Sequence, residues 1–104
     1  MYLVVFRNRK RADIDAAAYA EDAAAMEALA AQQPGYISFK SYAAEDGEVV
    51  ALSEWEDEAS ARAWGRQEEH WRVQQKSRKR YYASYTLFAY EPQRIHQFTA
   101  GDDA

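Results

Sequence analysis

The sequence predicts a single α+β domain in which strands and helices follow in the order β-α-β-β-α-β, with an antiparallel sheet and its helices on one face. Residues 36–42 and 49–55 alternate in side-chain character on either side of an Asp46-Gly47 turn, the pattern of a β-hairpin. An alanine-rich helical segment precedes this hairpin, and a second helical segment separates it from a final strand. This order is the split β-α-β plan of ferredoxin-like domains.

The first strand is predicted over residues 2–8, which are rich in β-branched and aromatic side chains. Because side chains alternate along a strand, Asn8 is the polar end of the face that carries Tyr2, Val4 and Phe6. Two interpretations of Asn8 stay open. It is either a strand-exit residue that bonds local backbone, or an amide that points into a pocket.

Both helices begin at aspartates, which are favoured N-caps. Asp13 is the predicted cap of a helix over residues 13–33, Asp15 favours the positive end of its dipole, and Pro34-Gly35 ends it. Asp57 is the predicted cap of the second helix. The face of the first helix expected to pack on the sheet carries Tyr19, Ala23, Met26 and Ala30.

The second helix carries aromatic side chains at a helical spacing. Trp64, Trp71 and Arg78 lie seven residues apart, so they share a face if the helix is continuous. Gly65 weakens this helix, which makes a break near it plausible. His70 is expected to one side of that face.

The last strand, predicted over residues 80–90, is apolar on both faces. One face carries Tyr81, Ala83, Tyr85, Leu87 and Ala89, and the other carries Tyr82, Ser84, Thr86, Phe88 and Tyr90. Two apolar faces both need cover. Helices cover one, so we expect a second copy of the chain to cover the other, in a homodimer. Glu91-Pro92 ends the strand, which gives a domain over residues 1–92 and a tail over residues 93–104.

Composition argues against several classes of function. A net charge of −4 disfavours nucleic-acid binding. The basic clusters at residues 7–11 and 76–80 are interpreted as solvated strand ends, with an anionic ligand held between them as the alternative. The sequence contains no cysteine, which excludes disulfides, thiolate catalysis and zinc-thiolate sites. No run approaches the ~20 apolar residues of a membrane span, so we expect a soluble cytoplasmic protein without membrane association.

No cofactor is expected either. The two histidines are far apart in the sequence and no carboxylates stand at ligand spacing, so no metal site is predicted. No glycine-rich phosphate motif is present, which disfavours nucleotide cofactors.

One set of residues follows a known family pattern: Ser53-Glu54-Trp55-Glu56-Asp57-Glu58-Ala59, Ala63-Trp64, Glu69-His70, Gln74 and the tyrosines of residues 82–85. In these residues the chain resembles the antibiotic biosynthesis monooxygenase family, within the dimeric α+β barrel proteins. The likeness covers about residues 2–90. The resemblance implies a homodimer whose sheets close into a barrel, with a pocket between each sheet and its helices. It also implies cofactor-independent oxidation of anthrone-like polyketides, quinol oxidation or haem breakdown.

The resemblance places Asn8, Trp64 and His70 in a catalytic role. The expected substrate-binding residues are Trp71, Gln74, Arg78 and Tyr82. Oxidation without a cofactor needs a proton acceptor, a donor to the substrate anion and an apolar cavity. His70 could accept the proton, Asn8 could donate to the anion, and the tryptophans could stack on a flat ring. The alternatives are a surface histidine beside Glu69 and tryptophans that only fill the core.

These residues are consistent with two functions. The first is a cofactor-independent monooxygenase that oxidises a polycyclic aromatic or quinol-like small molecule with O2. The second is a non-catalytic dimeric domain that binds an apolar ligand. Haem breakdown is less favoured, because Gln74 stands ten residues beyond Trp64, where haem-degrading relatives place an axial histidine.

Overall fold

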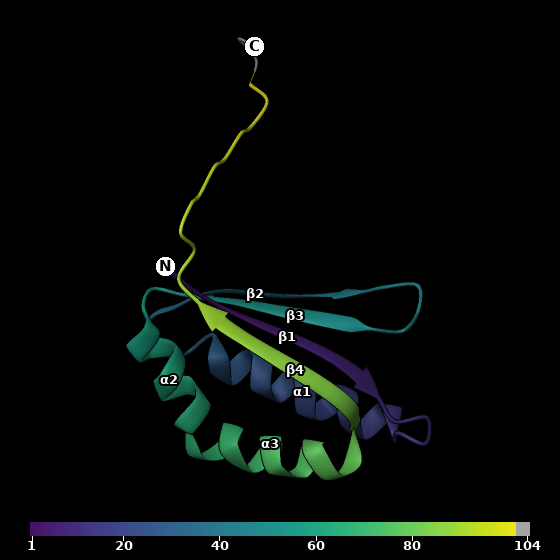
Figure 1. Cartoon of the computed structure of the whole chain (residues 1–104). Helices are drawn as coiled ribbons and strands as arrows, with labels where there is room; N and C mark the ends of the chain where they lie inside the picture. The colour runs from purple at the N-terminus through teal and green to yellow at the C-terminus, as the bar shows by residue number, and fades with distance from the viewer. Residues whose placement is uncertain (102–104) are drawn as a thin grey trace.

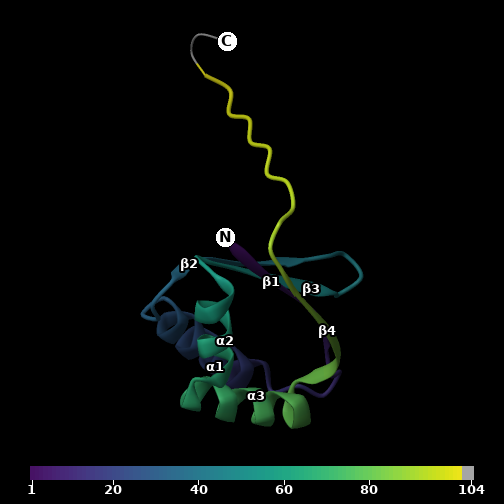
Figure 2. The ribbon, with the colours of Figure 1, turned by 60° about the vertical axis from the view of Figure 1, so that its left-hand side comes forward.

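A computed structural model of the chain describes residues 1–101 and confirms the β-α-β-β-α-β plan, with the second helix divided in two (Figure 1). The elements are β1 (Tyr2–Lys10), α1 (Ala16–Ala30), β2 (Tyr36–Ala43), β3 (Val49–Trp55), α2 (Glu58–Arg66), α3 (Glu68–Arg80) and β4 (Tyr82–Tyr90). The strands form one sheet in the order β2-β3-β1-β4, and each neighbouring pair is antiparallel. All three helices lie on one face of this sheet, as predicted (Figures 1 and 2).

Helix α1 is shorter than expected and begins two residues later. Asp15, not Asp13, is its N-cap: Asp15 has an extended backbone, and its carboxylate accepts a hydrogen bond from the Ala18 amide at 3.0 Å. The helix ends at Ala30, and the turn that follows includes Gly35 at a φ of 81°. The second predicted cap is confirmed, since the Asp57 carboxylate accepts from the Ser60 amide at 2.8 Å.

The second helix is not continuous. Gln67 has φ −58° and ψ 131°, which ends α2, and its side chain accepts a hydrogen bond from the His70 amide at 2.8 Å to cap α3. The axes of α2 and α3 therefore differ, as Figure 1 shows. The expected common face of Trp64, Trp71 and Arg78 does not form, because that prediction required one unbroken helix.

A bulge changes the face of one tyrosine in β4. Arg9 pairs with Ser84 but Lys10 pairs with Tyr82, so Ala83 is an extra residue on that strand. The bulge turns Tyr82 toward the helices, on the same side as Tyr85, where strict alternation had placed the two on opposite faces. Tyr81 lies before the strand, as the buried C-cap of α3.

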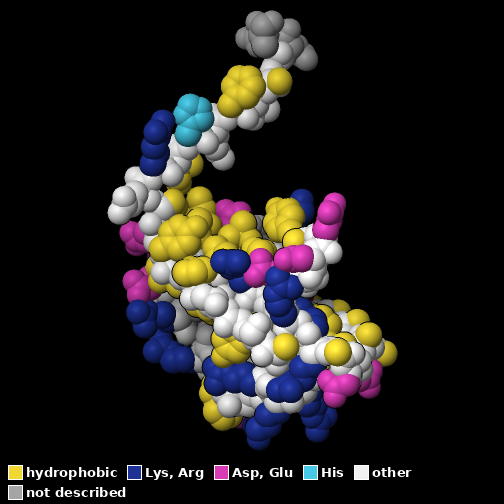
Figure 3. Space-filling model, turned by 45° about the vertical axis from the view of Figure 1, so that its right-hand side comes forward, with side chains coloured by type: hydrophobic (Ala, Val, Ile, Leu, Met, Phe, Trp, Pro, Cys, Tyr) yellow, Lys and Arg dark blue, Asp and Glu magenta, His cyan; other side chains and the backbone are white. Residues whose placement is uncertain are grey.

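The face of the sheet away from the helices is apolar and open. The register places Val5 between Leu52 and Phe88, and Leu3 opposite Tyr90, on this open face. Phe88 and Tyr90 are 47% and 45% exposed. Figure 3 shows hydrophobic side chains gathered over the sheet and at the base of the tail, with Lys and Arg side chains concentrated toward the helical side.

Beyond β4 the described residues form no helix or strand. The segment from residue 91 to 101 leaves the domain on the side opposite the helices (Figures 1 and 2). Ile95 and Phe98 are exposed along it. Within residues 1–101 no helix combines the length and apolar character that a membrane crossing requires.

Candidate functional site

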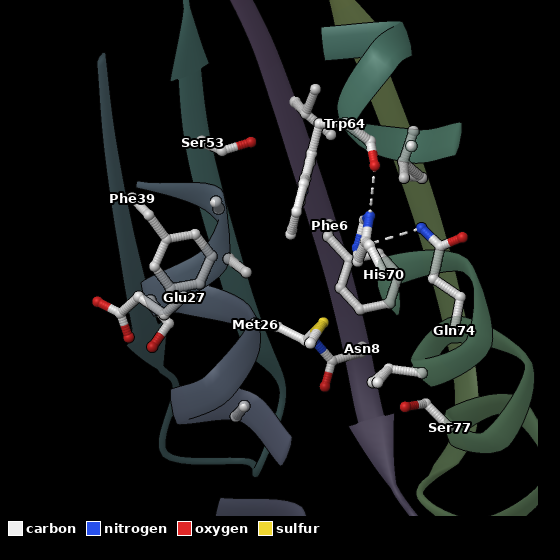
Figure 4. Close-up of a pocket in the computed structure, with 18 of the residues that line it drawn as sticks. Phe6, Asn8, Met26, Glu27, Phe39, Ser53, Trp64, His70, Gln74 and Ser77 are labelled. Atoms are coloured by element: carbon white, nitrogen blue, oxygen red, sulfur yellow. Dashed lines mark hydrogen bonds between the residues drawn. The ribbon is translucent and has the colours of Figure 1, made fainter. Parts of the chain in front are cut away.

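A cavity of about 670 Å³ lies between the sheet and the helices. Apolar and aromatic side chains supply most of its walls. The sheet contributes Val4, Phe6, Phe39, Ala51, Tyr82, Tyr85 and Leu87, and the helices contribute Tyr19, Met26, Trp64 and Val73. The polar side chains that reach it include Asn8, His70, Gln74 and Ser77 (Figure 4), and charged side chains line it as well: Asp22, Glu27, Arg62 and Arg78. A large apolar cavity with a few convergent polar groups is typical of a small-molecule site.

His70 faces this cavity from the first turn of α3. Its ring stacks on Trp64, with 3.8 Å between ring centres and 9° between planes. Its Nδ1 lies 2.8 Å from the Trp64 carbonyl oxygen (Figure 4). A carbonyl oxygen can only accept, so Nδ1 carries the proton and Nε2 has the free lone pair. Burial lowers the pKa of His70, and the bond to Trp64 opposes this only in part. The neutral imidazole is therefore favoured.

Gln74 contacts the second ring nitrogen of His70. Its Nε2 lies 3.3 Å from His70 Nε2 (Figure 4). The amide nitrogen donates and the imidazole nitrogen accepts, which agrees with the tautomer set by Trp64. Residues 70 and 74 lie one turn apart on α3, so the helix itself holds the pair together. His70 thus has a polar partner at each ring nitrogen before any ligand enters.

Further aromatic rings pack against Trp64 on the side away from His70. Trp55 is fully buried at the end of β3, its Nε1 donates to Ser53 Oγ at 3.0 Å, and its ring stacks on Trp64 at 6.2 Å. Tyr36 packs edge-on against Trp55 at 5.7 Å. Trp64 is held between Trp55 and His70, which limits the rotamers open to both cavity-facing rings.

Asn8 lines the cavity from β1, and only 3% of it is exposed. Its Oδ1 accepts a hydrogen bond from Lys10 Nζ. Of the two interpretations that the sequence left open, the structure favours the amide that points toward the pocket over one that bonds local backbone.

Tyr82 and Arg78 lie together near the same end of the cavity. The Tyr82 ring contacts Phe6 edge-on at 5.2 Å and Tyr85 at 5.9 Å, and Arg78 Cζ lies 5.9 Å from the centre of the Tyr85 ring. Burial raises the pKa of Tyr82 above its ordinary value, so its hydroxyl stays protonated. Both residues line the cavity.

The structure does not support the predicted substrate-binding role of Trp71. Its side chain is 53% exposed and does not line the cavity, because the break at Gln67 turns that side of α3 outward. The expected stacking of Trp71 on a substrate therefore has no geometric basis. His96 lies in the exposed tail, away from these residues.

Sequence reasoning missed several polar groups at the cavity, among them Ser77, Glu27 and Asp22. Asp22 on α1 accepts hydrogen bonds at 2.6 Å from both Tyr81 Oη and Lys76 Nζ, which lowers the pKa of its carboxyl group. Its partners are more than fifty positions away in the chain, so no local pattern identifies them. Its position three residues after the sheet-facing Tyr19 was the available signal.

The strand order and the helices define a ferredoxin-like domain with a cavity between its sheet and its helices. The sequence profile of the antibiotic biosynthesis monooxygenase family matches residues 1–76. The chain is 31% identical over 86 residues to the uncharacterised protein YqjZ of Bacillus subtilis, across 83% of this chain and 74% of YqjZ. This chain belongs to the antibiotic biosynthesis monooxygenase family.

Solved structures show the same fold. A variant of SnoaB, a cofactor-independent oxygenase from Streptomyces nogalater, is similar with a TM-score of 0.76 and 18% identity, over 90% of this chain and 94% of that one. Rv0793 from Mycobacterium tuberculosis is similar with a TM-score of 0.79 and 16% identity, over 92% and 98% of the two chains. At these identities the likeness establishes the architecture.

Proposed function

We propose that this chain is a cofactor-independent monooxygenase that oxidises a flat polycyclic aromatic or quinol-like molecule with O2 in the cavity between sheet and helices. The observation that carries the proposal is the neutral His70 ring stacked on Trp64 in the wall of an apolar cavity of about 670 Å³. That volume lies within the range of roughly 300–1,000 Å³ found for small-molecule sites.

For an anthrone, the reaction balances without a cofactor. A proton leaves the ring CH2 group, and the resulting enolate passes one electron to O2. The two radicals join through a new C–O bond, and the resulting peroxide anion takes back the proton to give a hydroperoxide. The remaining C–H proton and hydroxide then leave together as water, which leaves a carbonyl group. One oxygen atom enters the product and the other leaves as water. The protein must supply a proton acceptor, a donor to the anion and a dry cavity.

Three side chains match these needs. His70 Nε2 has the lone pair that can take the proton from the ring carbon and return it to the peroxide. The Asn8 amide can donate to the substrate oxygen as negative charge develops there. Trp64, held between Trp55 and His70, offers a flat face at the cavity. Gln74, Arg78 and Tyr82 line the same space and are proposed to contact the substrate.

A homodimer is part of this proposal. The open face of the sheet carries Val5, Leu52, Phe88 and Tyr90, and a monomer would leave this apolar surface in water. A second sheet packed on it would form the barrel that the family resemblance implies. The helix-side cavity would then open away from the interface.

A non-catalytic ligand-binding domain is the second candidate, and one contact favours it. Gln74 Nε2 already donates to His70 Nε2 at 3.3 Å, so the lone pair is engaged until the glutamine side chain moves. Haem breakdown is the least favoured function. An amide stands at residue 74, and both nitrogens of His70 have partners within the protein.

Oxygen uptake by metal-stripped protein tests the proposal. The panel contains anthrones, hydroquinones, and haem with a reductant. We expect uptake with an anthrone or hydroquinone, above the rate without protein, and a loss of about 10²–10⁴-fold in His70→Ala. His96→Ala is the matched control, because it removes the histidine of the tail, and its rate should equal that of the wild type.

Tryptophan fluorescence separates the two candidates. Trp64 lies in the cavity wall, so a bound aromatic ligand should quench it. Saturable quenching without oxygen uptake across the panel would favour the binding domain. Uptake that is unchanged in His70→Ala would contradict the proposed role of that residue.

A further inference from the structure

Asn8 has only one of its two polar ends satisfied by the described residues. Its Oδ1 accepts from Lys10 Nζ, while the structure records no partner within residues 1–101 for its Nδ2 group. No fully enclosed side-chain nitrogen or oxygen in this part of the chain lacks a partner, so Nδ2 must reach open space. Asn8 is 97% buried and borders both the cavity and a smaller pocket beside Arg7 and Glu48. Its side chain lies on the cavity side (Figure 4), so the open space that Nδ2 reaches is the cavity. The N–H bonds of this deeply buried amide are therefore available to a ligand there.

Lys10 sets this orientation. An ammonium group can only donate, so it requires the carbonyl end of the Asn8 amide and turns the NH2 end the other way. Lys10 Nζ also lies 4.8 Å from the ring centre of Tyr19 on α1 and 5.3 Å from that of Tyr82 on β4. Lys10 itself does not line the cavity. It stands behind Asn8, between the sheet and α1.

The charge of Lys10 is uncompensated in the described chain. Among residues 1–101 no carboxylate forms a salt bridge with it, since Asp22, on the same helix as Tyr19, is engaged by Lys76 and Tyr81. Burial lowers the pKa of Lys10. Within residues 1–101, the recorded contacts of its ammonium group are the Asn8 amide oxygen and the rings of Tyr19 and Tyr82. Arg78, which does line the cavity, also packs on a tyrosine ring at this end. Asp22 also lines the cavity, but its carboxylate is paired with Lys76 and Tyr81, so the charges of Lys10 and Arg78 favour an anion at this end.

We propose that Lys10 is a positioning residue that orients and polarises the Asn8 amide, so that the cavity selects the anionic, phenolate or enolate, form of an aromatic ligand. This inference rests on the proposed function, because it assigns the chemical form of the molecule that the same cavity binds. The ammonium draws electron density toward Oδ1, which makes the Nδ2 hydrogens stronger donors. An anionic oxygen placed there gains both the hydrogen bond and the field of the Lys10 charge.

A hydroxyanthraquinone dye such as alizarin tests the inference apart from turnover. The dye is flat and tricyclic, it is already at the quinone level and so undergoes no anthrone-type oxidation, and its phenol and phenolate forms differ in visible absorbance. Titrating the dye with pH, free and in the presence of saturating protein, gives its apparent pKa in each state. The wild-type protein should lower the pKa of the bound dye by about one unit, a preference of roughly tenfold for the phenolate.

Lys10→Met should abolish most of that preference while the neutral dye still binds. Lys10→Arg keeps the charge and should retain the preference within about threefold, an outcome that a purely packing role for the lysine stem would not require. Lys79→Met is the charge-matched control, because Lys79 is exposed on the last turn of α3, and it should behave as the wild type. Lys10→Gln is a second uncharged variant, in case Lys10→Met does not fold.

Each outcome of the dye titration supports or overturns the proposed role of Lys10. A wild-type protein that binds the dye with no preference for the phenolate overturns the inference and leaves the proposed function standing. A preference that survives in both uncharged variants also overturns the role of Lys10. A dye that does not quench wild-type tryptophan fluorescence at all contradicts the proposed cavity function together with the inference.

Discussion

At the scale of single residues, the site is defined by how its polar groups are held before a ligand arrives. The Trp64 carbonyl sets the His70 tautomer and Lys10 sets the direction of the Asn8 amide. Neither of these two hydrogen bonds could be predicted from the sequence. Residues 64 and 70 belong to different helices, and the contact exists because Gln67 bends the chain between them. The residue types in the site were predictable, whereas their hydrogen-bond partners required the geometry.

His70 should make stability depend on pH. Its pKa is lowered in the folded state by burial, so the folded protein binds this proton less readily than the unfolded chain does. The free energy of unfolding should therefore be highest above the ordinary histidine pKa of 6.5 and should fall as pH drops below it. Urea unfolding at about pH 7.5 and at about pH 5.5 measures this.

The comparison with His70→Gln isolates that histidine. The variant should lose less stability than the wild type over the same pH interval, because it has no imidazole to protonate. His96→Gln, in the tail, should match the wild type. Equal acid losses in wild type and His70→Gln would contradict the burial argument.

At the scale of elements, the strands and one helix cap followed from local chemistry. The hairpin over β2 and β3 was predicted from its turn and its alternation, and Asp57 was predicted as a cap. The cap of α1 was misplaced by two residues, at Asp13 instead of Asp15. The errors at the site came from tertiary effects. The bulge that turned Tyr82 depends on how β4 pairs with β1, and the outward position of Trp71 depends on the break at Gln67. A break was expected near Gly65, but its exact residue decides which side chains of α3 face the cavity.

Two glycines should respond oppositely to alanine. Gly65 lies inside α2 with no atom within 4 Å of an added Cβ, so Gly65→Ala should raise the free energy of unfolding by about 0.5–1 kcal/mol through helix propensity. Gly35 has φ +81°, and an added Cβ would lie 2.1 Å from Ser60 Oγ, so Gly35→Ala should destabilise. Denaturant melts of both variants measure the effects, and a stabilising Gly35→Ala would refute the account of this turn.

At the scale of the whole molecule, the open face of the sheet predicts a homodimer. Light scattering at micromolar concentration should give twice the 12.0 kDa mass of the chain. Phe88→Asp should produce a folded monomer, because it places a charge on the open apolar face that forms the proposed interface. Phe98→Asp is the matched control, since Phe98 is 82% exposed in the tail, and it should remain dimeric. A monomeric wild type would overturn the prediction.

Removing residues 93–104 tests the proposed division between domain and tail. The described part of this segment makes no helix or strand and leaves the domain (Figure 1), so the truncated chain should keep the melting temperature of the full one. Loss of the dimer on truncation would instead place the tail on the partner subunit.

An inhibition experiment tests whether oxygen chemistry occurs in the cavity between the sheet and the helices. Oxygen uptake with an anthrone is measured while the cavity is filled with a hydroxyanthraquinone, and tryptophan fluorescence reports occupancy in the same samples. We expect uptake to fall in proportion to occupancy, so that the inhibition constant equals the dissociation constant. Uptake that continues unchanged with the cavity filled would show that the chemistry takes place elsewhere.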